Sequence, residues 1–226
     1  MKQLSSKDRN FISREMKISL ESIESKLNED FLSPYRSRFE DAIAFFTNSI
    51  RKQSEQGYKF DCSPFKDSPA KNEINDHYSK LCKEINDTSA EVVLDSIRHA
   101  FCSYAYNGIH ELFTHQEKES WYPKVILDCV ITPNHIDLLP KKVTLYRGTD
   151  ISEFKKSIFG QSWTTKESVA HKFAYVHYKN QHWFKKVDRI ILKTEYPRQF
   201  VYYASQEPEF EVAIDTSKIS NVKRIK

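Results

Sequence analysis

Apolar residues in the first half of the chain recur three and four positions apart, which is the spacing of one face of an α-helix. A first helix is predicted over about residues 7–31 from Leu20, Ile23 and Leu27. The pair Ser33-Pro34 then predicts a second start, because serine caps a helix and proline fits its first turn. This second helix is expected to end at Gly57, and its apolar stripe consists of Phe39, Ile43, Phe46 and Ile50.

Two more helices follow the same rules. Ser68-Pro69 repeats the start signal, and the apolar stripe behind it is Ile74, Tyr78, Leu81 and Ile85. Residues 88–91 read Thr-Ser-Ala-Glu, a capping box that predicts the start of a further helix. That helix is expected to end near Asn107-Gly108, and its stripe is Val93, Ile97, Phe101 and Tyr104.

The pattern changes near Trp121, where prolines begin to divide the chain into short pieces. Val143–Tyr146 is expected to form a strand ending at Arg147, and Thr165 to cap a helix with Val169, Phe173 and Val176 on one face. The remaining strand candidates are 187–196, 200–203, 209–215 and 221–225. Helices first and antiparallel strands later indicate an α+β fold.

Composition excludes several classes of protein. The 226 residues are 39% apolar and 29% charged, enough for a globular core, but only four are glycines. Neither the GxGxxG motif nor the GxxxxGK[ST] motif occurs, so a nucleotide would have to bind on a different scaffold. No segment has the apolar length of a membrane span or the pattern of a signal peptide, and we therefore expect a cytoplasmic protein with no membrane partner.

Cysteine and histidine spacing argues against a metal site. The four cysteines show no CxxC pair, and free thiols in a reducing compartment are expected; they are Cys62, Cys82, Cys102 and Cys129. His171 and His177 lie six positions apart, which does not place them on one helix face. No metal is expected.

Charge is distributed unevenly along the chain. Residues 1–140 carry 18 basic and 22 acidic side chains, a net charge of −4. Residues 141–226 carry 17 basic and 9 acidic side chains, a net charge of +8. A basic half attracts polyanions, although ordinary solvated lysines would give the same count.

Three short motifs in the basic half carry candidate chemistry. They are Tyr146-Arg147-Gly148, Ser162-Trp163-Thr164-Thr165 and Glu209-Phe210-Glu211-Val212. An arginine binds phosphate oxygens in a bidentate way, and residues two apart on a strand share one face. Each motif alone also fits a simpler role: a strand-end ion pair, a polar strand edge with a helix cap, or a solvated acidic strand.

The order of the three motifs resembles the Arg-Ser-Glu signature of the clostridial-toxin-like mono-ADP-ribosyltransferases, over Val143 to about Asp215. The resemblance implies helices packed on a split antiparallel β-sandwich, with NAD as co-substrate. Residues 1–66 would be a helical extension and 67–226 the transferase domain. Within that domain, helices would occupy 68–120 and the β-rich NAD-binding core 141–226.

The resemblance also implies roles for the residues that bind NAD. Arg147 would grip the pyrophosphate, and Gly148 would let the backbone approach it. Ser162 would orient the catalytic glutamate and contact the nicotinamide ribose. Trp163 and Thr164 complete this NAD-binding motif, although they stand where the family has threonine and serine.

Glu211 would be the catalytic carboxylate, accepting the ribose 2′-hydroxyl and stabilising positive charge at C1. Glu209 would orient or deprotonate the acceptor, and on a strand it would share the face of Glu211. Tyr202, Tyr203 and Phe210 are expected to contact the acceptor. Glu207 adds a third carboxylate at the same period.

Two acceptors are compatible with the sequence. In the family, Glu-x-Glu accompanies protein arginine, whereas cations and rings interleaved over residues 172–189 suit stacking on RNA bases. The same pattern also suits an amphipathic helix covering a sheet. A toxin or anti-phage effector with a neutralising antitoxin is one expected setting; an NAD glycohydrolase and a non-catalytic binding module are the alternatives.

Overall fold

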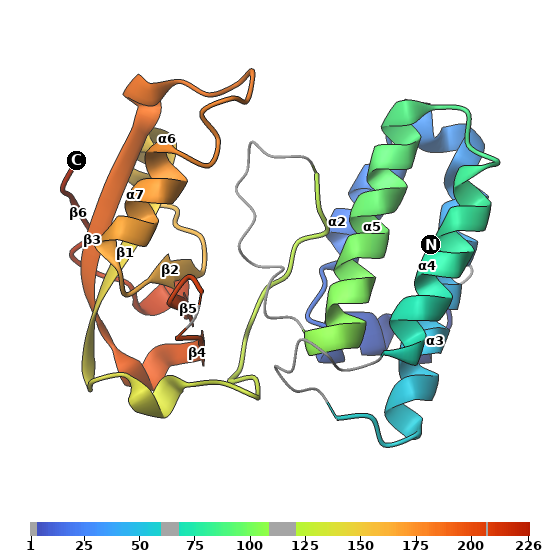
Figure 1. Ribbon diagram of the computed structural model, residues 1–226, viewed down its shortest axis with the longest axis horizontal. Helices are drawn as coiled ribbons and strands as arrows, with labels where there is room; N and C mark the ends of the chain where they lie inside the picture. Colours follow the sequence, from blue (N-terminus) through green and yellow to red (C-terminus); the bar gives the residue numbers. More distant parts are fainter. Residues whose placement is uncertain (1–3, 60–67, 109–120, 207) are drawn as a thin grey trace. The chain divides into compact units, whose positions relative to one another are not determined.

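The computed structural model describes residues 4–59, 68–108, 121–206 and 208–226 (Figure 1). The chain forms two compact units, Met1–Ile126 and Leu127–Lys226. The first is helical and the second is built on an antiparallel sheet, so the α+β class is confirmed. Among the described residues, no helix combines the length and apolar character needed to cross a membrane.

The helical unit is built around three long helices, α3 (Arg36–Glu55), α4 (Pro69–Cys82) and α5 (Thr88–Asn107). Their apolar stripes form its core, because Phe39, Phe46 and Phe101 are fully buried. Short elements precede them: α1 (Ser6–Asn10), the π-helical turn η1 (Phe11–Glu15), α2 (Leu20–Leu27) and the 3-10 turn η2 (Asp30–Tyr35).

One predicted helix and one predicted helix start were wrong. The helix expected over 7–31 is divided into α1, η1 and α2, and the chain leaves helical geometry at Lys17, whose φ of 57° is left-handed. The next residue, Ile18, is buried and makes a β-bridge to Val125, which removes it from any helix. Pro34 lies inside a 3-10 turn, so α3 starts two residues later than the Ser33-Pro34 signal implies.

The other helix ends follow the sequence more closely. The Ser68 hydroxyl accepts the backbone N–H of Lys71 at 3.3 Å, as expected for a capping serine. Asp87, one residue before the predicted capping box, caps α5 by accepting the N–H of Ala90 at 2.9 Å. Gly57 follows the end of α3 with a φ of 81°.

A buried polar network ties the three long helices together. The Gln53 amide donates to the carbonyl of Ala105 at 2.8 Å and accepts from the Ser68 hydroxyl at 3.0 Å. Helices α4 and α5 therefore belong to the same compact unit as α3, Met1–Ile126. The assignment of residues 67–226 to one transferase domain stays a prediction.

The second unit holds six strands: β1 (Lys142–Asp150), β2 (Ser162–Thr164), β3 (Arg189–Pro197), β4 (Val201–Ala204), β5 (Glu211–Ile214) and β6 (Lys223–Arg224). They form one antiparallel sheet in the order β4-β5-β2-β1-β3-β6. Two helices, α6 (Ile151–Lys156) and α7 (Glu167–Tyr175), and short 3-10 turns connect them: η4 (Ile136–Leu138), η5 (Lys186–Asp188), η6 (Arg198–Phe200) and η7 (Thr216–Lys218).

The backbone pairing between neighbouring strands is shortest at the centre of the sheet, between β1 and β2. Strands β1 and β3 pair along nine residues, from Lys142↔Pro197 to Asp150↔Arg189. Strands β1 and β2 share a single pair, Tyr146↔Thr164. Two three-stranded halves are therefore joined by one paired residue position in a continuous sheet.

The two faces of the sheet differ in their cover. One face carries the main apolar core, with Leu145, Trp163 and Val212 among its buried residues and α6 packed against it. Helix α7 covers the other face with Ala170 and Ala174 against Ile191. Figure 1 shows α7 lying along the sheet.

Gly148 sets how closely α7 approaches β1. A Cβ at this position would lie 1.9 Å from the carbonyl oxygen of Ala170 and 2.6 Å from the backbone nitrogen of Ala174. These are backbone atoms, so they cannot rotate away. Gly148, which we expected to let the backbone approach a ligand, is the position where the backbone of α7 lies against β1.

Replacing Gly148 by alanine should therefore destabilise the β-rich unit, since α7 must move off the sheet. We expect Gly148→Ala to lower the free energy of unfolding by about 1–3 kcal/mol, the usual cost of overpacking. Urea unfolding followed by circular dichroism measures it. Lys142→Ala, at an exposed position of the same strand, is the control and should change stability little; equal stability of the two variants would contradict the packing role.

Candidate functional site

Ser162 and Glu211 meet across two neighbouring strands. Strands β2 and β5 pair in the register Ser162↔Ala213 and Thr164↔Glu211, which puts Ser162 diagonally opposite Glu211. The Ser162 hydroxyl donates to Oε1 of Glu211 at 2.6 Å. Glu211 is 8% exposed, so this hydrogen bond holds the carboxylate in a mostly dry position.

Strand alternation fixes which face carries this pair. Trp163 and Val212 belong to the main apolar core on one face of the sheet. Their neighbours Ser162 and Glu211 therefore emerge on the opposite face, which α7 covers. Ser162 and Glu211, 49 positions apart in sequence, thus form a polar site on the α7 side of the sheet.

Arg147 leaves the sheet on the other face. Arg147 lies an even number of positions from Val143 and Leu145 on the same strand, so its side chain emerges on their face, which carries the main core. Its Nε and Nη2 each donate to a carboxylate oxygen of Glu153 at 2.8 Å, a bidentate pair. Arg147 and Glu153 are each 9% exposed.

The third guanidinium nitrogen of Arg147 reaches the neighbouring strand. Nη1 donates to the backbone carbonyl of Ser162 at 2.6 Å, just beyond the single pair that joins β1 to β2. A side-chain hydrogen bond therefore continues the link between strands whose backbone pairing has ended. Ser162 thus binds Arg147 through its carbonyl and Glu211 through its hydroxyl.

The three predicted key residues are therefore connected, but Arg147 and Glu211 are directed to opposite faces. The fork that we expected to grip a pyrophosphate is directed at Glu153. This geometry favours a positioning role for Arg147, which holds β2 and with it the Ser162–Glu211 pair.

Glu153 was missed by the sequence-based prediction. Its carboxylate also accepts the Thr149 hydroxyl at 2.5 Å. Burial raises the pKa of Glu153, but the charge of Arg147 and hydrogen bonds from Arg147, Thr149 and the Gly160 backbone outweigh it and lower that pKa below its ordinary value. The sequence offered only a weak signal for it: a single carboxylate, six residues after the arginine, in a six-residue helix that also carries two lysines.

Gly160 completes the setting of Arg147. A Cβ on Gly160 would lie 2.6 Å from Nη2 of Arg147, so any other residue would push against the guanidinium. Sequence reasoning missed this glycine as well, because no motif marks it.

Glu209 does not continue the strand of Glu211. Strand β5 begins at Glu211, and Phe210 before it has a φ of 50°, a conformation that a bulky side chain rarely adopts. The two-residue alternation that we expected to align the two glutamates therefore does not apply. The Glu209 carbonyl is held by the Thr164 hydroxyl at 2.8 Å, and Lys166 Nζ lies 4.9 Å from the centre of the Phe210 ring.

Two predicted ligand contacts are core residues. Trp163 is 2% exposed and its indole N–H donates to the carbonyl of Gly160 at 3.0 Å, so its side chain belongs to the core. Tyr203, predicted to contact the acceptor, is buried in β4. Large aromatic side chains such as these are commonly buried in the core of a protein.

Tyr202 has a more accessible position. It is the extra residue at an irregularity of the β4–β5 pairing, between Val201 and Tyr203, and it is half-buried. Partial burial, the charge of Asp215 and a hydrogen bond to Asp215 raise the pKa of its hydroxyl. An acceptor contact by Tyr202 remains compatible with this geometry.

Thr165 does not cap α7 as we predicted, because the helix begins after Lys166 and no side chain caps it. The hydroxyl of Thr164 instead accepts the backbone N–H of Lys166, the residue before α7, at 3.1 Å. The same hydroxyl donates to Glu209, so Thr164 joins the start of α7 to the loop before Glu211. Glu207 lies outside the described residues.

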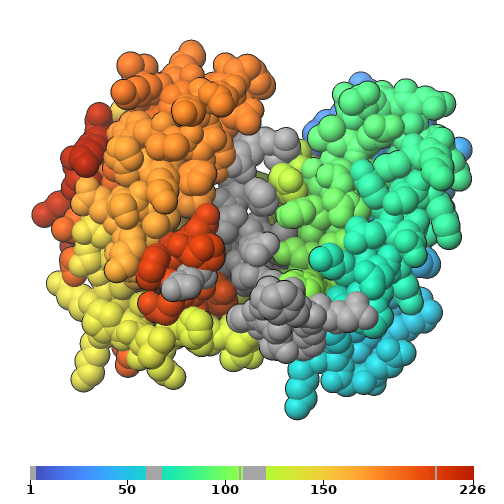
Figure 2. Space-filling model, in the orientation of Figure 1, coloured from blue at the N-terminus to red at the C-terminus, as the bar shows by residue number. Residues whose placement is uncertain are grey.

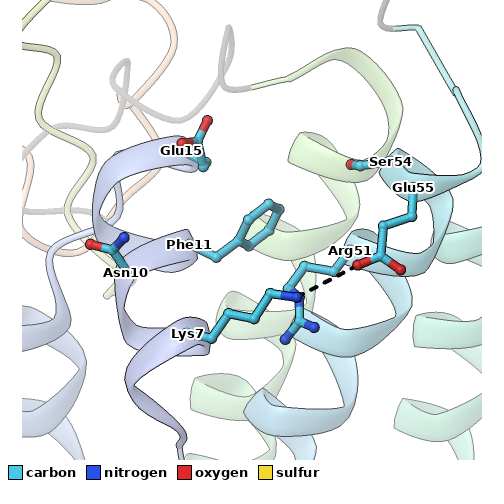
Figure 3. A pocket seen from close by; sticks show the side chains of 7 residues that line it. All are labelled: Lys7, Asn10, Phe11, Glu15, Arg51, Ser54 and Glu55. Carbon is cyan, nitrogen blue, oxygen red and sulfur yellow. Dashed lines mark ion pairs between the residues drawn. The ribbon is translucent and has the colours of Figure 1, made fainter.

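A separate pocket lies in the helical unit and contains none of the predicted site residues (Figure 3). It measures about 250 Å³ and is lined by Lys7, Asn10, Phe11, Glu15, Arg51, Ser54 and Glu55. Its basic side chains already have acidic partners, since Lys7 pairs with Glu55 at 3.8 Å and Arg51 pairs with Asp8. Across the part of the chain that the structure describes, no cluster of histidine, cysteine or carboxylate side chains could hold a metal ion.

The Arg147–Glu153 pair predicts a specific dependence of stability on mutation and pH. Glu153→Gln leaves a buried guanidinium without its counter-charge, and we expect a loss of about 3–5 kcal/mol in the free energy of unfolding of the β-rich unit. Replacing both residues by leucine should cost less than the two single changes together.

The sign of the pH effect follows from the lowered pKa of Glu153. Its stabilisation is present above the unfolded-state pKa and is lost as pH falls through the lower folded-state value. Urea unfolding between pH 7 and pH 3 should therefore show a fall at acid pH that is shallower in Glu153→Gln. An identical pH profile in the variant would rule out the ionised pair.

The chain matches no protein-family model, no curated protein and no solved structure. Its function must therefore be inferred from its residues and their geometry.

Proposed function

We propose that this chain is an NAD-dependent mono-ADP-ribosyltransferase whose reaction takes place beside Glu211. The observation that carries the proposal is the hydrogen bond of 2.6 Å from the Ser162 hydroxyl to the Glu211 carboxylate. A serine that orients a glutamate in this way, on adjacent strands and in the predicted order, is the arrangement that the Arg-Ser-Glu resemblance implies.

The chemistry needs a fixed negative charge. The bond between C1 of the ribose and the nicotinamide nitrogen breaks, and its electron pair leaves with nicotinamide. Positive charge then develops on the ribose, as in glycoside hydrolysis. A carboxylate that is 8% exposed and held by Ser162 is preorganised to stabilise that charge, because little water competes with it.

The acceptor completes the reaction. Its nucleophilic atom forms the new bond to C1, and a base removes the proton that the nucleophile loses. Glu209 is the proposed base or orienting group, because it is half-buried and its backbone carbonyl is held by Thr164, the residue paired with Glu211. The oxidation state of the substrates does not change.

Arg147 enters this proposal as a positioning residue. Its bonds to Glu153 and to the Ser162 carbonyl support the strand that presents the Ser162 hydroxyl. Because β1 and β2 share one residue pair, the sheet is close to division at this point. We propose that this narrow junction corresponds to the split of the β-sandwich in that family.

The strained backbone at Phe210 supports a functional role for the same segment. A left-handed φ at a bulky residue costs of order 1–3 kcal/mol and persists where the surroundings impose it. Here it lies between the two proposed functional glutamates. Such outliers cluster at active sites.

The two glutamates should fail differently when altered. We expect Glu211→Gln to reduce NAD turnover by about 10²- to 10⁴-fold, because the charge facing the ribose is lost. Glu209→Gln should retain NAD cleavage but lose transfer to the acceptor. The measurement is incubation of each variant with NAD labelled in the ADP-ribose part plus a cell extract, with nicotinamide release followed in parallel.

The same assay separates the alternatives. Label released by protease indicates a protein acceptor, and label released by ribonuclease indicates RNA. Free ADP-ribose without a labelled macromolecule indicates an NAD glycohydrolase. No NAD turnover by the intact chain, with or without extract, would leave only the binding module and end the proposal.

Ser162→Ala tests the orienting bond on its own. The carboxylate stays in place but loses its donor, so kcat should fall by about ten-fold, the worth of roughly 1.4 kcal/mol. KM for NAD should also rise, since the same hydroxyl is proposed to contact the ribose. Ser152→Ala, at a serine in α6, is a matched control; a full wild-type rate in Ser162→Ala would remove the orienting role.

A further inference from the structure

A continuous stretch of the β-rich unit lacks acidic side chains altogether. Between Glu167 and Asp188 the chain carries four lysines, three histidines and five aromatic residues. The lysines are Lys172, Lys179, Lys185 and Lys186, and the aromatic residues are Phe173, Tyr175, Tyr178, Trp183 and Phe184. We call residues 171–187 the aromatic–basic tract.

The structure arranges the rings of this tract in sequence. Phe173 and His177 lie 4.7 Å apart between ring centroids, His177 and Tyr178 6.3 Å, and Tyr178 and Trp183 5.4 Å. The rings of Phe173, Tyr178 and Trp183 are half-buried, so one part of each is held by the protein and another part is accessible. A supported but accessible ring can stack on a planar partner.

The basic side chains of the tract are accessible to solvent. All four lysines of the tract are exposed, and so are His171, His177 and His182. Arg189 anchors the tract from beneath: its guanidinium donates to the carbonyls of Ala174 and Phe173 at 3.1 and 3.2 Å and lies 5.9 Å from the Tyr178 ring centre. The segment around α7 and the loop after it, coloured orange, lies on the face seen in Figure 2.

Covering the sheet does not account for this composition. The small residues Ala170 and Ala174 make the tight contact of α7 with the sheet. Tyr178 and Trp183 follow the end of α7 at Tyr175 and belong to the loop before β3. The rings therefore extend past the element that needs an apolar face.

We propose that the aromatic–basic tract is a docking surface for single-stranded nucleic acid. Lysines neutralise phosphates, and accessible rings stack on unpaired bases irrespective of sequence. The tract leads directly out of the proposed site, because α7 starts just after Thr164, whose hydroxyl holds the backbone of Lys166 and of Glu209. That the docked strand is the acceptor rests on the proposed function; the binding itself does not.

The test is direct binding without NAD, so its outcome is independent of catalysis. A fluorescein-labelled, mixed-sequence single-stranded RNA of 20 nucleotides is titrated with the full chain, and anisotropy is measured over a series of salt concentrations. Trp183→Ala should weaken binding by roughly ten-fold through lost stacking. The double change Lys185→Gln/Lys186→Gln should reduce the slope of log K against log salt by about 1.4, or 0.7 per phosphate contact.

Matched variants separate the tract from general charge. Lys155 and Lys156 are also adjacent and exposed, but they lie on α6 at the other face of the sheet, and Lys155→Gln/Lys156→Gln should leave affinity and slope unchanged. Trp183→Phe should retain most of the affinity. Equal effects of the two lysine pairs, an unchanged affinity in Trp183→Ala, or tighter binding of poly-glutamate than of RNA would overturn the proposal, the last in favour of an acidic protein partner.

Discussion

The buried ion pair between Arg147 and Glu153 is the constraint on which the candidate site depends. Its two oxygen–nitrogen distances of 2.8 Å and its low exposure place it among interactions that are costly to break, because either partner alone would be an uncompensated charge in the core. The pair joins β1 to α6, and the remaining arm of the guanidinium joins β1 to β2. Three segments therefore take their relative positions from one side chain.

That geometry explains why a sheet so narrow at its centre holds a fixed site. One residue pair between β1 and β2 is a weak backbone connection. The bond from Arg147 to the Ser162 carbonyl strengthens it from one face, and α7 crosses the other face in contact with Gly148. The backbone carbonyl of Ser162 accepts from Arg147, while its hydroxyl donates to Glu211. A buried pair on one face thus orients a carboxylate on the opposite face.

Local signals predicted most of the secondary structure. Helical stripes such as Phe39, Ile43 and Phe46 are buried as expected, and the caps at Ser68 and near Thr88 lie within one residue of their predicted places. The failures have a common physical cause. Lys17, Trp163 and Phe210 take conformations or positions that distant residues impose, and residue spacing does not report those contacts.

The candidate site shows the same limit more sharply. Sequence order placed Arg147, Ser162 and Glu211 together, and hydrogen bonds through Ser162 do connect them. The sequence order did not reveal Glu153, because a single glutamate in a short helix is normally expected to face solvent. Only the structure shows that the Arg147 side chain lies against it. A bidentate arginine was taken as evidence for a phosphate, but any carboxylate offers the same pair of oxygens. Whether such an arginine binds a ligand or stabilises its own fold is decided by which carboxylate the chain folds against it, and here that carboxylate lies six residues away.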